Sequence, residues 1–159
     1  MSHFLLVLVS ILLALPASSA ELIGRIVGIT DGDTLTLLDA ARQQHKIRLA
    51  GIDAPESHQP FGQRSKTNLS ALAFNKEVIA DCTKVDKYKR LICKVAVNGI
   101  DINLEQVKAG MAWHYKQYAR EQTLRDREDY EVAEFNAKIR RFGLWADKNP
   151  EPPWEWRKR

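Results

Sequence analysis

The sequence is poor in the residues that bind zinc. Its 159 residues include two cysteines, Cys82 and Cys93, and four histidines. Zinc sites take Cys and His ligands at short, regular spacings. The two cysteines lack such a spacing, and His45, His58 and His114 lie far apart in the chain. The sequence therefore disfavours a zinc centre, and a chain of this length can bury a core without many covalent staples.

Charge is absent from the start of the chain, since no Lys, Arg, Asp or Glu occurs in residues 1–20. Residues 4–16 are almost purely apolar, and a stretch of small residues ends at Ala20. This order predicts a secretory signal peptide over residues 1–20, cleaved after Ala20. The apolar run is shorter than the roughly 20 residues that cross a bilayer. Cleavage is favoured over retention as an anchor, although the leader lacks the usual Lys or Arg. We therefore expect a secreted or periplasmic protein without stable membrane association.

Repeats and low-complexity linkers are absent from residues 21–159, which predicts a single domain. The formal net charge is +4 and none of it comes from the first twenty residues. A basic surface favours polyanionic partners but does not identify one. Composition alone therefore leaves the function open.

Five segments have the composition of β-strands and are separated by turn residues. They are residues 22–29, 34–38, 46–50, 78–83 and 90–97. Helical spacing predicts helices over residues 64–74 and 121–141, and Asp101 can cap a third helix that runs through Val107. This α+β pattern is compatible with a small closed barrel of the oligonucleotide-binding (OB) type, although composition does not select it over other α+β folds.

The last predicted helix and the tail beyond it carry many large apolar residues. In the helix, Val132, Phe135, Ile139 and Phe142 recur every three or four positions, as on the buried face of an amphipathic helix. The tail at residues 149–156 contains three prolines and two tryptophans. We expect it to be non-helical, with its Trp rings packed over the barrel.

Cys82 and Cys93 lie symmetrically about Lys87-Tyr88. If that dipeptide is the turn of an antiparallel hairpin, the two cysteines face each other across its strands. An oxidising compartment would permit a disulfide that closes a loop of about 12 residues and stabilises the fold by about 2 to 3 kcal/mol. The alternative is two independent buried thiols.

Acidic residues follow two of the predicted strands. Asp31 and Asp33 share one turn, and Asp53 and Glu56 share the loop after another strand. If those strands are neighbours, the carboxylates converge at one end of the sheet, where they would suit Ca²⁺, a hard cation bound by oxygens. An EF-hand is excluded because the twelfth position from Asp31 is Arg42.

Two arginines change the interpretation of that acidic cluster. Arg48 lies in the strand that leads to Asp53, and Arg90 follows the turn of the hairpin. A guanidinium makes two parallel hydrogen bonds to phosphate oxygens. Two such groups and a divalent cation would stabilise the charge that develops during phosphodiester hydrolysis. Glu56 would accept a proton from the attacking water.

Three ordered motifs carry a family resemblance, together with two shorter segments near the C-terminus. They are Asp31–Thr34, Ile47–Glu56 and Asp86–Arg90, then Val107–Trp113 and Gly143–Trp145. With them, the sequence resembles the staphylococcal nuclease (thermonuclease) family over nearly the whole of residues 21–159. The resemblance implies a five-stranded OB-fold β-barrel with three α-helices, an endonuclease that cuts DNA and RNA, and products with 3′-phosphate ends. We expect a monomer.

The resemblance also implies a metal site with Ca²⁺ as the cofactor. By position, Asp33 and Asp53 match the carboxylate ligands, and Ala54 matches a ligand that binds through its backbone carbonyl. Glu56 matches the residue that holds the nucleophilic water.

Further positions match residues that hold the nucleic acid. Arg48 and Arg90 match the two phosphate-binding arginines. Lys87 and Tyr88 match residues that hold the substrate beyond the scissile bond, and Tyr118 matches a tyrosine that packs against a base.

Two features depart from the family pattern. Lys89 stands where the family usually has Gly, so a positive-φ turn would be lost and Arg90 displaced. The loop at residues 57–62 is shorter than in the staphylococcal enzyme. The alternative function is a catalytically inactive OB-fold module that binds single-stranded nucleic acid, and a third is a structural or partner-binding exported domain.

Overall fold

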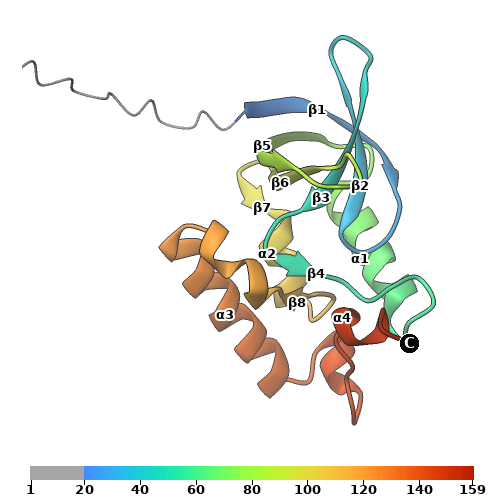
Figure 1. Cartoon of the computed structure of the whole chain (residues 1–159), viewed down its shortest axis with the longest axis vertical. Coiled ribbons are helices and arrows are strands. Elements are labelled where there is room, and N and C mark those ends of the chain that lie inside the picture. Colours follow the sequence, from blue (N-terminus) through green and yellow to red (C-terminus); the bar gives the residue numbers. More distant parts are fainter. Residues whose placement is uncertain (1–19) are drawn as a thin grey trace, which may run out of the picture.

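The computed structural model describes residues 20–159, and the predicted signal peptide lies outside the described residues except for Ala20 (Figure 1). Ala20 is the first residue of a strand and pairs with Cys82. Within residues 20–159, no helix has both the length and the apolar character needed to cross a membrane.

The strands lie in about the first two thirds of the described chain. Their bounds are β1 (Ala20–Ile29), β2 (Thr34–Asp39), β3 (Gln44–Leu49), β4 (Ile52–Asp53), β5 (Glu77–Val85), β6 (Leu91–Val97), β7 (Ile100–Asp101) and β8 (Trp113–His114). The five predicted strands are all present as β1, β2, β3, β5 and β6, each within a few residues of its expected bounds.

The five long strands close into a barrel. Their order is β3-β2-β1-β5-β6, and β3 also pairs with β6, which joins the two ends. That closing pair is parallel, with Arg48 opposite Ile92, whereas the other pairs are antiparallel. The α+β class and the OB-type barrel are therefore confirmed.

The barrel interior is filled by apolar side chains that alternate along the strands. Nearly inaccessible side chains from four strands meet there, namely Ile26, Leu35, Leu37, Ile47, Leu49 and Val95. Successive side chains of a strand point to opposite faces, so the residues between these apolar ones point out of the barrel.

The helices cover one end of the barrel. They are α1 (Gly62–Ala73), α2 (Ile102–Lys108), α3 (Leu124–Ile139) and α4 (Pro153–Trp156), with 3₁₀ turns at Lys116–Glu121 and Gly143–Ala146. The Asp101 carboxylate accepts a hydrogen bond from Leu104 N at 3.1 Å, which is the expected cap of α2. The Thr123 hydroxyl caps α3 in the same way through Asp126 N at 3.1 Å. This cap explains why α3 begins later than residue 121.

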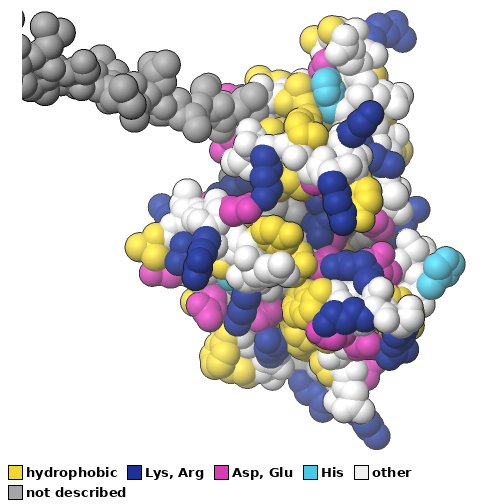
Figure 2. Space-filling model, viewed as in Figure 1, with side chains coloured by type: hydrophobic (Ala, Val, Ile, Leu, Met, Phe, Trp, Pro, Cys, Tyr) yellow, Lys and Arg dark blue, Asp and Glu magenta, His cyan; other side chains and the backbone are white. Residues whose placement is uncertain are grey.

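The large apolar side chains of α3 face solvent, contrary to the expectation of a buried face. Phe135 is 61 % exposed and Ile139 is 65 % exposed, and hydrophobic side chains are visible on the surface over α3 (Figure 2). The buried face instead carries Tyr130, Ala133 and Ala137. Small alanine side chains let α3 approach its neighbour α2 closely. The face of α3 that is buried is therefore the one with small residues, and not the one with the large apolar repeat.

The C-terminal tail also departs from expectation, because part of it is helical. Pro153 occupies the first turn of α4, where its missing N–H costs nothing. As expected, a tail tryptophan packs on the body of the protein: Trp154 stacks on Tyr115 with ring centroids 5.3 Å apart and meets Trp113 edge-on. The tail therefore lies back across the end of the barrel near β4 (Figure 1).

A contact between two glycines fixes the end of α3 against the end of α2. Gly110 and Gly143 both have positive φ, at 65° and 52°. Leu144 N donates to Gly110 O at 2.9 Å, and a Cβ on Gly143 would lie 2.2 Å from that same oxygen. The backbones touch because neither residue has a side chain.

The β5–β6 hairpin pairs Cys82 directly with Cys93. Their sulfur atoms are bonded as a disulfide, so the two cysteines face each other as expected. A bulge between Cys82 and Lys84 shifts the register by one residue nearer the turn, where Lys84 pairs with Ile92.

Candidate active site

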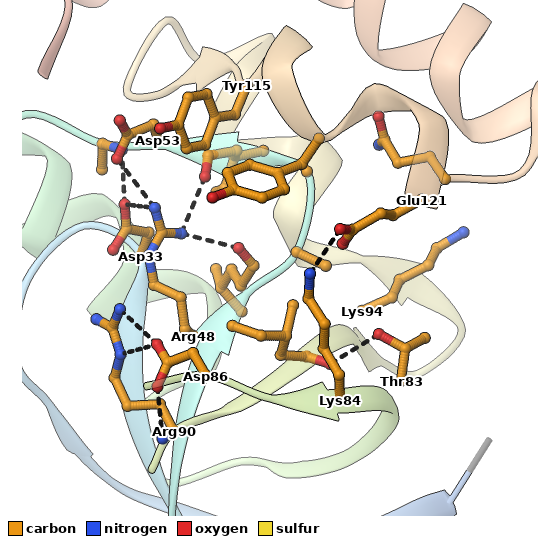
Figure 3. Close-up of a pocket in the computed structure, with 18 of the residues that line it drawn as sticks. Asp33, Arg48, Asp53, Thr83, Lys84, Asp86, Arg90, Lys94, Tyr115 and Glu121 are labelled. Atoms are coloured by element: carbon orange, nitrogen blue, oxygen red, sulfur yellow. Dashed lines mark hydrogen bonds and ion pairs between the residues drawn. The ribbon is translucent and has the colours of Figure 1, made fainter. Parts of the chain in front are cut away.

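One cavity of about 740 Å³ lies between the turn before β2, the strands β3 and β4, the β5–β6 hairpin and residues 115–130, and Arg157 of the tail also lines it. Figure 3 shows how Asp33, Arg48 and Asp53 lie in this cavity, with Asp86 and Arg90 near them. Every residue predicted to bind metal, phosphate or substrate lines it, that is Asp33, Arg48, Asp53, Ala54, Glu56, Lys87, Tyr88, Arg90 and Tyr118. The structure thus brings together four segments that are distant in the sequence. Their chemical roles stay predictions.

Arg48 lies between Asp33 and Asp53 at the bottom of the cavity, and these three residues are called the floor. Its Nη2 donates to Asp53 Oδ1 at 2.9 Å and lies 3.1 Å from Asp33 Oδ2. Its Nη1 donates to the backbone carbonyls of Leu49 and Ile52 at 2.8 and 2.9 Å. The side chain is 12 % exposed. The two carbonyls and two carboxylates that accept from it fix its orientation.

Strand pairing explains why these groups meet. Thr34, next to Asp33, pairs with Arg48 in the β2–β3 ladder, and Leu49 N donates to Asp33 O at 2.8 Å. Gly51, at φ 74°, then turns the chain into β4. Asp53 pairs with Trp113 of β8, which anchors it beside Arg48.

Asp33 is buried and strongly bonded. Its Oδ2 accepts from Ala54 N at 2.6 Å, and its Oδ1 accepts from the Thr34 hydroxyl at 3.2 Å. Burial raises the pKa of Asp33 to about 7, although the positive charge of Arg48 opposes the rise. Asp31 serves the turn, because its Oδ1 accepts from Asp33 N at 3.1 Å.

Arg90 lies at the rim of the cavity, on the hairpin. Asp86 accepts from Arg90 Nε at 2.8 Å and from the backbone N–H groups of Tyr88 and Arg90, each at 2.9 Å. Burial alone would raise the pKa of Asp86, but these bonds and the guanidinium outweigh it and lower that pKa. Arg90 Nη1 reaches Thr34 Oγ1 at 3.4 Å, so its fork is aimed at the floor.

Lys89 keeps the positive φ that its replacement of Gly was expected to remove. Lys89 itself adopts φ 63°, and its N–H donates to Asp86 O at 3.0 Å. The positive-φ turn is therefore retained with a lysine in it, and the strain is borne locally.

Aromatic and basic side chains form the outer wall. Tyr88 and Tyr118 are exposed. Lys87 Nζ lies 5.0 Å from the Tyr88 ring centroid, and Lys84 Nζ lies 5.1 Å from that of Tyr118. Tyr115 meets Tyr118 edge-on at 4.9 Å. Such surfaces suit nucleic-acid strands, whose bases stack on rings while phosphates attract cations.

Lys84, Tyr115 and Asp86 line the cavity but carry no predicted role of their own. Two signals in the sequence could have identified them. The alternation of β5 predicts that Lys84 points out of the barrel, and Tyr115 lies three residues before Tyr118, for which a role was predicted. Lys and Arg side chains are spread over the face seen in Figure 2, with Asp and Glu among them.

Arg157, from the tail, is the functional-site residue that sequence reasoning missed altogether. It pairs with Asp53 at 2.8 Å and with Glu56 at 2.7 Å. In the sequence it is one of three consecutive basic residues at the C-terminus, and no spacing connects it to the acidic cluster 100 residues earlier.

The oxygen donors of the floor fit a hard divalent cation. The Asp33 and Asp53 carboxylates share one guanidinium nitrogen. Burial raises the pKa of Asp33 to about 7, which disfavours its anionic form, and a bound cation would favour that form again. Within residues 20–159, no three His, Cys, Asp or Glu side chains are grouped to hold a metal by themselves. An ion here would therefore also need a backbone oxygen and water, which Ca²⁺ accepts.

Comparisons with known proteins agree with this geometry. Residues 46–147 match the family described as staphylococcal nuclease homologue. An uncharacterized endonuclease of Haemophilus influenzae is 46% identical over 84% of this chain and 72% of its own length. An uncharacterized endonuclease of Escherichia coli O157:H7 is 37% identical over 96% and 95%. A micrococcal nuclease of Shigella flexneri is 39% identical over 87% and 82%.

Proposed function

This chain belongs to the staphylococcal nuclease family and is a nuclease, and we propose that it is exported, depends on Ca²⁺ and cuts both DNA and RNA to leave 3′-phosphate ends. The observation that carries the proposal is the convergence of two buried carboxylates and two guanidinium groups in one cavity. A cavity of that composition binds a phosphodiester and stabilises added negative charge.

Arg48 and Arg90 are the phosphate-binding groups in this proposal. Arg48 is held at the floor, and Arg90 is aimed at the same place from the rim. Two planar forks on one phosphate neutralise the charge that grows when a fifth oxygen approaches phosphorus. In the structure both Nη atoms of Arg48 are bonded to protein acceptors, and Arg90 Nε and Nη2 are paired with Asp86. A phosphate would therefore take these donors in exchange for part of those bonds.

Glu56 is the proton acceptor. Its carboxylate is half-exposed at the mouth of the cavity, next to Asp53 through their shared partner Arg157. A carboxylate in that position orients a water molecule toward the phosphate and takes its proton. The water oxygen bonds to phosphorus as the bond to the 5′ oxygen breaks. The 5′ oxygen takes up a proton from solvent, and the phosphate stays on the 3′ oxygen.

Asp33 and Asp53, with the carbonyl of Ala54, would hold the Ca²⁺. When bound, the ion supplies positive charge to the phosphate oxygen and lowers the barrier as a Lewis acid. Lys87 and Tyr88 would hold the strand beyond the scissile bond, and Tyr118 offers its exposed ring to a base. Few of these groups can discriminate bases or sugars, which favours broad specificity.

Export is supported by the leader-like residues 1–20 and by the cysteines. A disulfide persists in oxidising compartments and is rare in the cytosol, and the hairpin places Cys82 and Cys93 in bonding position. A secreted or periplasmic location satisfies both features.

The test is digestion of plasmid, single-stranded DNA and RNA by the purified protein, with Ca²⁺ or with a chelator, followed by end-group analysis. We expect cutting of all three with Ca²⁺, none with chelator, and 3′-phosphate ends. Glu56→Gln, purified identically, controls for contaminating nucleases. Retained binding of single strands without any chelator-sensitive cutting would instead establish the inactive binding module.

A further inference from the structure

The guanidinium of Arg157 occupies the acidic side of the cavity. Its Nη2 donates to Asp53 Oδ2 at 2.8 Å and its Nη1 to Asp53 Oδ1 at 3.1 Å, so the pair is bidentate. Nη1 also donates to Glu56 Oε1 at 2.7 Å. One tail residue therefore holds both the carboxylate proposed as a metal ligand and the one proposed as the base.

The tail is built to deliver this side chain. Pro153 is buried, and Trp154 stacks on Tyr115 of the cavity wall at an interplanar angle of 6°. The buried Gln59 side chain bridges the two segments, because its Nε2 donates to Glu151 O at 2.6 Å and its Oε1 accepts from Glu56 N at 3.0 Å. The tail and the loop that carries Glu56 are thus tied to each other beside the site.

This arrangement conflicts with a metal at the same carboxylate. Both oxygens of Asp53 accept hydrogen bonds from Arg157, and Oδ1 also accepts from Arg48. A cation that takes Asp53 as a ligand must displace at least part of the bidentate pair. The positive charge of a remaining guanidinium would also repel it. Arg157, 41 % exposed, has solvent into which it can move.

We propose that Arg157 is a positioning residue of the metal site, which holds Asp53 and Glu56 in place in the metal-free protein and yields Asp53 to the metal when it binds. This inference rests on the proposed Ca²⁺ site. In it, Arg157 of the tail and the ion compete for the carboxylate of Asp53.

The test is calorimetric titration of Ca²⁺ into the full protein without nucleic acid. Wild type is compared with Arg157→Ala, Arg157→Lys and the control Arg159→Ala, which removes a charge from the same tail but from a residue paired with Glu151 at 2.6 Å. Arg157→Ala should bind Ca²⁺ about tenfold more tightly or better, since a charge-assisted bidentate pair no longer competes. Arg159→Ala should stay within about twofold of wild type.

Arg157→Lys should fall between wild type and Arg157→Ala, because an ammonium keeps the charge but not the fork. Thermal unfolding supplies a second reading: Ca²⁺ should raise the melting temperature of Arg157→Ala by more than that of wild type, and the chelated samples show that the variant is folded.

Calcium binding by wild type with equal or weaker binding by Arg157→Ala would overturn the competition and leave the proposed nuclease site intact. Absence of Ca²⁺ binding in every variant at concentrations on the order of 10⁻³ M, the weak end for calcium sites, would refute the metal site itself and the inference with it.

Discussion

The floor and the rim of the cavity each present an arginine, but they hold it in different ways. Arg48 on the floor is 12 % exposed. It is bonded to Leu49, Ile52 and Asp53, which follow it closely in the chain, and to Asp33 from the turn before β2. Arg90 on the rim is 24 % exposed, and its carboxylate partner Asp86 is four residues away in the same hairpin turn. The ion pairs of the floor therefore join Asp33 to Asp53 at a buried place. The ion pair of the rim stays within one hairpin turn, and only the 3.4 Å contact of Arg90 with Thr34 reaches another strand.

Arg48→Ala should have the largest effect, because it damages both activity and fold. Turnover should fall by about 10² or more when one fork is lost from the transition state. In chelator, the free energy of unfolding should fall by about 3 kcal/mol, because two buried carboxylates lose a shared partner. Digestion rates and denaturant unfolding measure the two quantities. Arg48→Lys should recover part of the stability and little of the activity; unchanged turnover in Arg48→Ala would remove it from the mechanism.

Arg90→Ala should lower turnover with little effect on the free energy of unfolding. Turnover should again fall by about 10², but the free energy of unfolding should change by less than about 1 kcal/mol, since the pair it breaks is local and partly solvated. The same two assays apply. A stability loss equal to that of Arg48→Ala would erase the distinction between rim and floor.

The disulfide should stabilise the hairpin on which the rim is built. The double variant Cys82→Ala/Cys93→Ala should lose about 2 to 3 kcal/mol of unfolding free energy, the value for a loop of this length, with its Ca²⁺-dependent activity largely kept. Denaturant unfolding of oxidised wild type, reduced wild type and the variant tests this. Reduction that leaves wild-type stability unchanged would show that the cross-link contributes nothing.

Lys89→Gly should give the smallest effect, a gain of about 0.5 to 1 kcal/mol from relief of the positive φ. Activity should be unchanged, since Arg90 is already well placed. Asn98, at φ 50° in the next turn, is the matched control, because Asn tolerates this conformation and Asn98→Gly should gain less. A slower Lys89→Gly enzyme would mean that the lysine side chain assists the substrate.

The strands and most of the cavity residues could be predicted from the sequence because their signals are local, whereas the closed barrel was distinguished from other α+β folds only by the family resemblance. Alternation defines the strands, and the motifs around Asp33, Asp53 and Arg90 each lie at a strand end. The disulfide partners followed from hairpin symmetry alone. Strand ends of neighbouring strands meet in space, so the convergence of the site followed from the strand order.

The rest depended on packing that no local pattern reports. The solvent-facing position of Phe135 and Ile139 follows from how closely α3 approaches α2, which a helical repeat does not encode. The place of Arg157 follows from where Trp154 and Pro153 dock, and basic residues at a C-terminus are usually solvated. The positive φ of Lys89 could not be predicted, because lysine disfavours the conformation that the turn imposes.

The paired glycines at the ends of α2 and α3 have a consequence for how this chain can vary. A methyl group at either position would meet backbone atoms 2.2 Å away, a carbonyl oxygen of the opposite segment, and backbone cannot rotate aside as a side chain can. Gly110 and Gly143 therefore constrain each other, because a side chain on either one would strike the backbone of the segment that carries the other. A mutational library screened for soluble, folded protein should return glycine at both places, even though neither lies in the cavity.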